Sequence, residues 1–332
     1  MTHKDIKDLL NNSLNPAQGL NFADSNSAAM NALAEFFEIE KNDPRAIRAK
    51  RAEVMALIEE VIDENLPKRL EDRIGDFAEI KTYARDAEVV FEVRGVGKRR
   101  ARLSIRKGAR GGLYQAARLD DMQLTVPTWV ETVGIFVTLE EILLGKVTLA
   151  DLMANILDGF VERMYVNVME ALRTAAEAAP AANKKMGANA FDAADLDGII
   201  RVIAAYGQPV IAGFRPEIGQ ITNVQGSTYN PNIPGSDLDE IKNRGYVAQY
   251  KGVPIIELPN YLMDNVNNNE WLLEEGALFV LPMGEKPVKV ALKGDLHIEE
   301  TKHASGSVEQ NAHKILGVGV LLNNNIGIYE IK

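Results

Sequence analysis

The longest amphipathic helical pattern in the chain begins at Thr148 and continues to about Ala178. Its apolar positions recur at helical spacing, and they are Leu149, Leu152, Met153, Ile156, Phe160, Met164, Val168 and Leu172. A helix rises about 1.5 Å per residue, so this segment would be roughly 45 Å long, wider than a small domain. The pattern therefore predicts one continuous helix that crosses a folded body rather than lying inside one.

A basic ribbon, residues 94–112, contrasts with the rest of the chain. It contains eight Lys or Arg residues and no Asp or Glu, although the formal net charge of the protein is −10. Apolar residues alternate with charged ones before it and within it, around the glycines of Gly95-Val96-Gly97. This alternation predicts a β-hairpin that turns at these glycines, with 88–94 and 101–106 as its strands. Because a lone hairpin is marginally stable in water, it should lie on another surface.

The charge of the ribbon has two interpretations. A nucleic-acid site would need aromatic side chains for stacking or a helix for a groove, and only Phe91 and Tyr114 flank the cluster. Contact with an acidic protein surface explains both the charge and the apolar face, and we favour it, while nucleic acid stays open. The candidate inter-subunit contact residues are Arg94, Lys98, Arg99, Arg100, Arg102, Arg106, Lys107 and Arg110.

Composition narrows the class of protein. With 46% hydrophobic and 25% charged residues in 332, the chain is typical of a folded globular protein. It has no cysteine, which excludes disulfides, thiolate metal sites and cysteine nucleophiles. No secretory signal is visible at the N-terminus, and no apolar run approaches the roughly 20 residues of a membrane-spanning helix.

Local patterns predict further elements. Asp43 and Pro44 are typical of a helix start, and the apolar stripe that follows should end near Pro67. Residues 1–42 are polar and should form an arm that becomes ordered only against neighbouring subunits. From about residue 185 the chain alternates between short strand and helix patterns, which indicates a compact α/β body.

A search for catalytic patterns assigns no residue. The four histidines lack the spacing that places two ligands on one helical face. The sequence Gly317-Val318-Gly319 has no third glycine and no following helix, so it does not form a dinucleotide fingerprint. We therefore expect no catalytic, cofactor-binding or metal-binding residue and no enzymatic activity.

Three C-terminal segments carry a family resemblance: YVAQYKGVPIIELPNYLMDN, ALFVLPMGEKPVKVALKGD and SVEQNAHKILGVGVLLNNNIGIYEI. Together with the order of the parts, they resemble the major capsid protein of tailed bacteriophages, the Hong Kong 97-type fold. That resemblance implies an α+β fold in four parts. These are an N-terminal arm and charged helix (1–85), an E-loop hairpin (86–122), a P-domain with a long spine helix (123–184, completed by 286–315) and an A-domain (185–285, completed by 316–332).

The resemblance also implies a function and partners. The chain would assemble with copies of itself, as hexamers and pentamers, into the icosahedral shell of a virion, inside the host bacterial cytoplasm. It would contact packaged double-stranded DNA non-specifically, a portal and a scaffolding protein, and no membrane. Two alternatives stay open: an encapsulin-like nanocompartment shell, and a cytoplasmic nucleic-acid-binding enzyme that uses residues 94–110.

Two features of the family are less clear in this sequence. Some members carry a fused scaffolding segment of about a hundred residues, whereas only some 40 residues precede the first strong helix here, so we expect a separate scaffolding protein. Some members cross-link a Lys to an Asn of a neighbouring subunit. Lys98 and Lys107 lie in the corresponding element, but no local motif supports a role for them.

Overall fold

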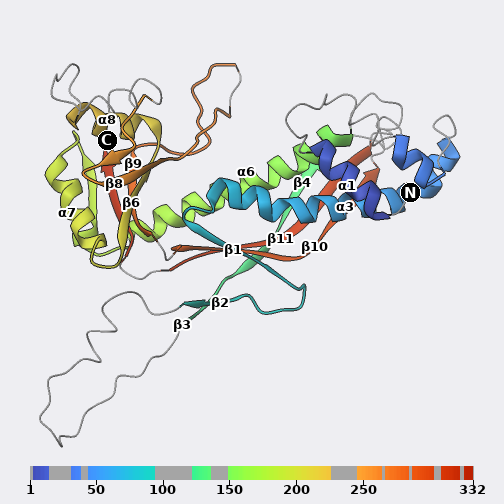
Figure 1. Cartoon of the computed structure of the whole chain (residues 1–332), viewed down its shortest axis with the longest axis horizontal. Helices are drawn as coiled ribbons and strands as arrows, with labels where there is room; N and C mark the ends of the chain where they lie inside the picture. Colours follow the sequence, from blue (N-terminus) through green and yellow to red (C-terminus); the bar gives the residue numbers. More distant parts are fainter. Residues whose placement is uncertain are drawn as a thin grey trace, which may run out of the picture.

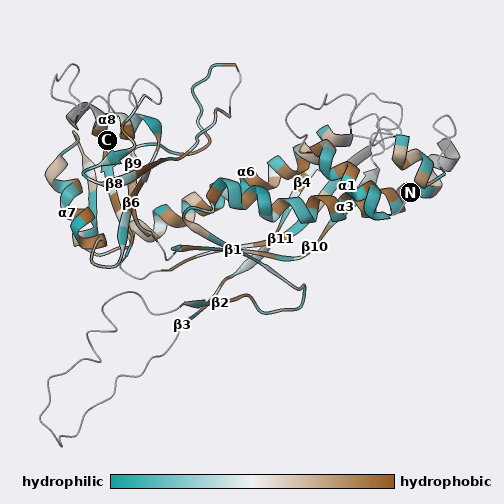
Figure 2. Cartoon of the chain, viewed as in Figure 1, coloured by the Kyte–Doolittle hydropathy of each residue, from teal (hydrophilic) through white to brown (hydrophobic). Residues whose placement is uncertain are grey.

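One unbroken helix, α6 (Leu149–Glu177), crosses the middle of the molecule and connects two bodies that each contain a β-sheet (Figure 1). The prediction of a single continuous helix is confirmed. Apolar and polar residues alternate around α6, as its amphipathic pattern requires (Figure 2). The computed structural model describes residues 3–14, 31–38, 44–93, 122–135, 149–225, 245–263, 266–283, 286–302, 308–321 and 325–331.

Helix α3 (Pro44–Ile74) runs beside α6 (Figure 1). It begins at the predicted Pro44, but the predicted end near Pro67 is wrong, because the helix continues for two more turns. A proline inside a helix costs about 3 kcal/mol. Burial of Leu70 and Ile74, both fully buried, returns about 1.5–3 kcal/mol each and outweighs that cost.

Helix α1 (His3–Leu14) packs against both α3 and α6. Its side chains Ile6, Leu10 and Leu14 are buried in the main core, as are Leu33 and Phe37. The expectation that residues 1–42 gain structure only from neighbouring subunits is therefore wrong for residues 3–14 and 31–38. An apolar stripe on each short segment finds its partner within the same chain.

The first sheet has four strands in the order β1-β10-β11-β4. Strand β1 (Ala78–Tyr83) is parallel to β10 (Val288–Lys302), which pairs antiparallel with β11 (Val308–Val320), and β11 pairs antiparallel with β4 (Thr128–Ile135). Helices α3 and α6 cover this sheet, and the main hydrophobic core lies between the helices and the strands. At Gly159 a Cβ atom would lie 3.2 Å from Val133 of β4, so glycine allows α6 to lie close to the sheet.

The second sheet has six strands in the order β5-β12-β9-β6-β8-β7. They are β5 (Lys184–Ala188), β6 (Gln208–Gly213), β7 (Gln249–Tyr250), β8 (Val253–Glu257), β9 (Ala277–Met283) and β12 (Gly327–Ile331). A 3₁₀ turn, η1 (Ala181–Asn183), precedes β5, and helices α7 (Ala193–Ile203) and α8 (Arg215–Gln225) pack on the sheet. Asp192 caps α7 by accepting a hydrogen bond from the backbone N–H of Ala194, at 2.8 Å.

A small third sheet consists of β2 (Val90–Val93) and β3 (Met122–Thr125), which pair antiparallel. The predicted tight hairpin is therefore wrong for residues 90–93, because their partner is β3 and not residues near 101. The cause is packing: Phe91 and Val126 are buried together with Ala291 of β10, beside Leu124. The eight predicted contact residues, from Arg94 to Arg110, lie outside the described residues.

Candidate inter-subunit contact surfaces

The described base of the basic ribbon is firmly attached to the first sheet. The hydroxyl of Tyr83 donates a hydrogen bond to the carbonyl of Val90 at 2.8 Å, and the rings of Tyr83 and Phe91 meet edge to face at 5.8 Å. The ammonium group of Lys81 lies over the Phe91 ring, 5.0 Å from its centre. The described residues on either side of 94–121 thus lie at a fixed place, in β2 and β3.

The sheet beneath this base is held by buried charge pairs. Lys289, only 5% exposed, contacts the carboxylate of Glu79, which also binds Lys81 at 2.8 Å. Burial alone would raise the pKa of Glu79, but the hydrogen bonds from Lys289 and Lys81 hold that pKa below its ordinary value. Glu79 is therefore ionised at neutral pH and keeps β1 paired with β10.

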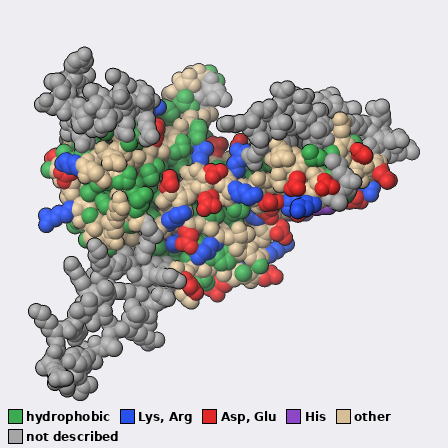
Figure 3. Space-filling view, viewed as in Figure 1, with side chains coloured by type: hydrophobic (Ala, Val, Ile, Leu, Met, Phe, Trp, Pro, Cys, Tyr) green, Lys and Arg blue, Asp and Glu red, His purple; other side chains and the backbone are tan. Residues whose placement is uncertain are grey.

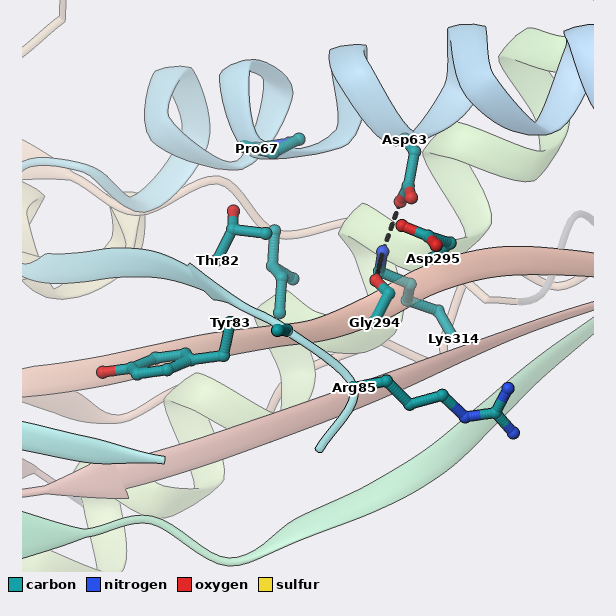
Figure 4. A pocket seen from close by; sticks show the side chains of 10 residues that line it. Asp63, Pro67, Thr82, Tyr83, Arg85, Gly294, Asp295 and Lys314 are labelled. Carbon is teal, nitrogen blue, oxygen red and sulfur yellow. Dashed lines mark hydrogen bonds and ion pairs between the residues drawn. The ribbon is translucent and has the colours of Figure 1, made fainter. Parts of the chain in front are cut away.

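A pocket of about 390 Å³ lies between α3, the end of β1 and an irregular point of β10 (Figure 4). The ammonium group of Lys314, whose side chain is 2% exposed, donates to Asp63 and to the carbonyl of Gly294. Asp295 and Arg85 lie at the same pocket. Through these two contacts Lys314, on β11, links α3 to the irregular point of β10.

Helix α3 also replaces a missing strand at the edge of β10. β1 pairs with β10 only as far as Lys293, and the register of β10 shifts between Lys293 and His297. Beyond that point, the backbone N–H of Leu296 donates to Asp63 at 3.1 Å, and the N–H of Ile298 donates to Glu59 at 2.6 Å. Two carboxylates four residues apart on one helix face thus satisfy two donors on one strand edge.

No metal or catalytic constellation emerges from the described part of the chain. It contains no group of three His, Asp or Glu side chains placed to hold a metal ion. His297 and His313 are opposite each other on β10 and β11, and each lies within 4 Å of Glu299. Two histidines and one carboxylate on an exposed strand surface are typical of solvated side chains. Among the described helices, none is long and apolar enough to span a membrane.

Sequence reasoning missed one exposed element, the connection between β8 and β9, which projects from the body (Figure 1). It forms a short antiparallel ladder in which the N–H of Met263 donates to the carbonyl of Glu270 and the N–H of Leu272 donates to the carbonyl of Tyr261, both at 2.8 Å. We call residues 258–263 and 266–276 the β8–β9 hairpin. Its asparagines are typical of turns and hide this ladder from a prediction based on sequence pattern.

The surface over α3 and α6 differs from the basic ribbon in its charge pattern. Figure 3 shows Lys and Arg side chains interspersed with Asp and Glu there. Exposed pairs such as Arg69 with Asp158, at 3.5 Å, account for this mixture. The single sign of residues 94–112 is therefore not a general property of this protein's surface.

Comparisons with known proteins agree with this architecture. A family model described as "SPbeta prophage-derived putative capsid protein YonB" matches residues 17–330. No curated protein matched the sequence. A solved structure described as "Capsid of native GTA particle computed with C5 symmetry" is 14% identical, with a TM-score of 0.50 over 78% of this chain and 89% of that one.

Two further structures show weaker likeness. The satellite phage P4 procapsid, which includes a size determination protein, is 12% identical, with a TM-score of 0.49 over 81% of this chain and 90% of that one. A virus-like particle from Pyrococcus furiosus is 11% identical, with a TM-score of 0.45 over 81% and 98%.

The family match covers nearly the whole chain and is to a phage capsid protein. It therefore supports a phage capsid protein over the two alternatives, a nanocompartment shell and a nucleic-acid-binding enzyme. The likeness to the GTA capsid shows that the mixed helix-and-sheet fold is one that a capsid subunit adopts. The chain belongs to the YonB family of prophage-derived capsid proteins, and it is a structural protein of the virion, the major capsid protein that forms the head shell.

Proposed function

We propose that this protein builds its shell by extending residues 94–112 of each subunit over an adjacent copy. In this proposal β2 and β3 are the base of an E-loop, α6 is the spine helix of a P-domain formed with the first sheet, and the second sheet with α7 and α8 is the A-domain. The carrying observation is the charge of the ribbon: eight basic residues and no acidic one in a chain of net charge −10.

The partners follow from the same reading. Copies of the chain form hexamers and pentamers, the shell assembles in the host cytoplasm, and it encloses packaged double-stranded DNA that it contacts non-specifically. A separate scaffolding protein and a portal complete the assembly. These partners are implied by the resemblance to tailed-phage capsid proteins.

The stability of the contact between the ribbon and the adjacent copy depends on many ion pairs repeated across the shell. One exposed ion pair contributes only about 0–1 kcal/mol. A shell repeats the same contact at every subunit boundary, so several weak pairs per contact become decisive. Such pairs weaken with salt, because the Debye length falls to about 3 Å at 1 M.

A charge-removal variant tests the proposal. Replacing Arg99, Arg100 and Arg102 with Ser should leave the subunit folded but reduce the yield of shells, and raised salt should reduce the yield for the unmodified chain. The matched control replaces Lys50, Lys68 and Arg163 with Ser. These three side chains are exposed on α3 and α6, and the control loses three positive charges, as the test variant does.

Electron microscopy and sedimentation measure the yield of shells, and circular dichroism measures the fold. If the Arg99, Arg100 and Arg102 variant assembled normally but bound or packaged DNA poorly, the ribbon would be a nucleic-acid site and the proposal would be wrong.

A further inference from the structure

The β8–β9 hairpin has a rigid foot. The hydroxyl of Tyr165 on α6 donates to the carbonyl of Pro259 at 2.7 Å, and the Arg73 guanidinium of α3 lies between the rings of Tyr165 and Tyr261, 5.3 and 4.6 Å from their centres. The Asn260 side chain joins the two arms, because its oxygen accepts from the N–H of Leu273 at 3.1 Å and its amide donates to the carbonyl of Leu273 at 3.0 Å. The hairpin is therefore held in place before any partner binds.

The outer part of the hairpin is apolar and exposed. Tyr261 is 42% exposed, Met263 66%, Val266 84% and Trp271 49%. These four are a majority of the large hydrophobic side chains exposed on the described part of the chain. A rigid projection that concentrates apolar side chains in water is typical of a protein contact surface.

The charge of the same segment has one sign. Between residues 258 and 276 the sequence contains Asp264, Glu270, Glu274 and Glu275 and no Lys or Arg. Glu274 is already paired with Arg173 at 2.8 Å, whereas the side chain of Glu270 is exposed. A partner that fits must be basic and must carry apolar side chains of its own.

A pocket beside Trp271 also combines apolar walls with carboxylates. It measures about 520 Å³ and lies between the hairpin and the first turn of α8, with walls that include Phe214, Pro216 and Leu258. Glu257 and Glu275 line it, together with Arg215, which is 3.9 Å from Glu257. An arginine with its aliphatic stem on the apolar wall and its guanidinium at these carboxylates would match this lining.

Residues 94–112 are the segment of this chain with the required chemistry, since they combine eight basic residues with Val96, Leu103 and Ile105. In Figure 1, the strands β2 and β3, where that segment leaves the body, lie on the opposite side of the molecule from the β8–β9 hairpin. A contact between opposite sides of successive copies is head to tail, and such contacts form a ring when the rotation from one copy to the next closes.

We propose that the outer part of the β8–β9 hairpin, residues 261–263 and 266–271, is the docking surface for residues 94–112 of a second copy of this chain. This inference rests on the proposed function and adds the receiving surface to it. The apolar tip contacts the apolar residues of the ribbon, and the hairpin carboxylates pair with its arginines.

A photo-cross-linking amino acid at position 266 tests the contact in assembled shells. Shells made from an equal mixture of ¹⁵N-labelled and unlabelled subunits distinguish contacts between copies from contacts within one copy. Mass spectrometry should find position 266 joined to peptides of residues 94–112, in mixed-isotope pairs. The same amino acid at Met186, which is 41% exposed on β5, is the control and should give no such product.

A second variant measures the contribution to assembly. Replacing Met263 and Val266 with Ser should raise the subunit concentration needed for half-assembly at least about tenfold, because burial of one such side chain exceeds the 1.4 kcal/mol that corresponds to tenfold. The thermal unfolding of unassembled subunits should not change, because both side chains are exposed.

The proposal is wrong if shells form and position 266 joins only other segments, or if the Met263 and Val266 variant assembles like the unmodified chain. If the unmodified chain forms no shells at all, the proposed function fails first and this inference falls with it.

Discussion

Replacing Asp63 with Ala should lower the free energy of unfolding by about 3 kcal/mol, because it leaves the Lys314 ammonium buried without its carboxylate. Breaking one partner from a buried ion pair generally costs about 3–5 kcal/mol. Two observations reduce the cost of the broken ion pair, whereas the lost acceptor for the backbone N–H of Leu296 adds to it, so the expected cost is at the lower end of that range rather than below it. The Asp63 side chain is 22% exposed, and Lys314 keeps its hydrogen bond to the carbonyl of Gly294.

The double variant Asp63→Ala with Lys314→Met separates the charge from the packing. It removes the unpaired ammonium and fills its site with an apolar side chain of similar length, so it should be more stable than Asp63→Ala alone. Glu53→Ala is the control on the same helix, because the pair that Glu53 forms with Lys50 is exposed and its loss should cost about 0–1 kcal/mol.

Urea unfolding of unassembled subunits, followed by circular dichroism, measures these three variants and Lys314→Met alone. The reasoning is refuted if Asp63→Ala costs no more than Glu53→Ala, or if the double variant is as unstable as the sum of its two single changes.

Two further predictions concern the core and the pH dependence of stability. Phe160→Ala should cost about 3–5 kcal/mol in urea unfolding, because the ring is fully buried in the main core. Asp158→Ala on the exposed face should cost under about 1 kcal/mol, and equal costs would contradict the assigned faces of α6. Burial raises the pKa of Glu217 above its ordinary 4.5, so the unfolded chain releases this proton at lower pH than the folded chain. Stability should therefore fall as pH rises from 4.5 through the raised pKa, and Glu217→Gln should remove that part of the slope in a urea titration repeated at several pH values. An unchanged slope would show that the carboxyl is solvated.

The elements that the sequence predicted well are those whose signal is local. The stripe from Leu149 to Leu172 has one period over many turns, and the structure shows a single helix there. Pro44 marks a helix start by chemistry that involves only neighbouring residues, and α3 begins there.

The wrong predictions involve a choice between partners that are distant in sequence. The alternation around Phe91 indicated a strand but not which segment would pair with it. The pairing with β3 is favoured because it allows Phe91 to be buried with Ala291 of β10. Pro67 was taken as the end of a helix because its cost is local, whereas the compensating burial of Leu70 and Ile74 depends on the tertiary fold.

The candidate surfaces were predicted only in part, for the same reason. Charge alone identified the basic ribbon. The role of its residues from Arg94 to Arg110 in contacts between subunits stays a prediction. The β8–β9 hairpin could not be found, because its apolar residues stand among asparagines and their exposure depends on the arms packed beneath them. Asp63 and Lys314 are 251 residues apart in the sequence, so no local sequence pattern indicates that they pair.

Electron microscopy of the purified, expressed chain tests the central claim most directly. A major capsid protein should appear as closed shells of uniform size, or as hexamers and pentamers that close into shells when the protein is concentrated at low salt. A uniform population of small oligomers that never forms shells under these conditions would contradict the account.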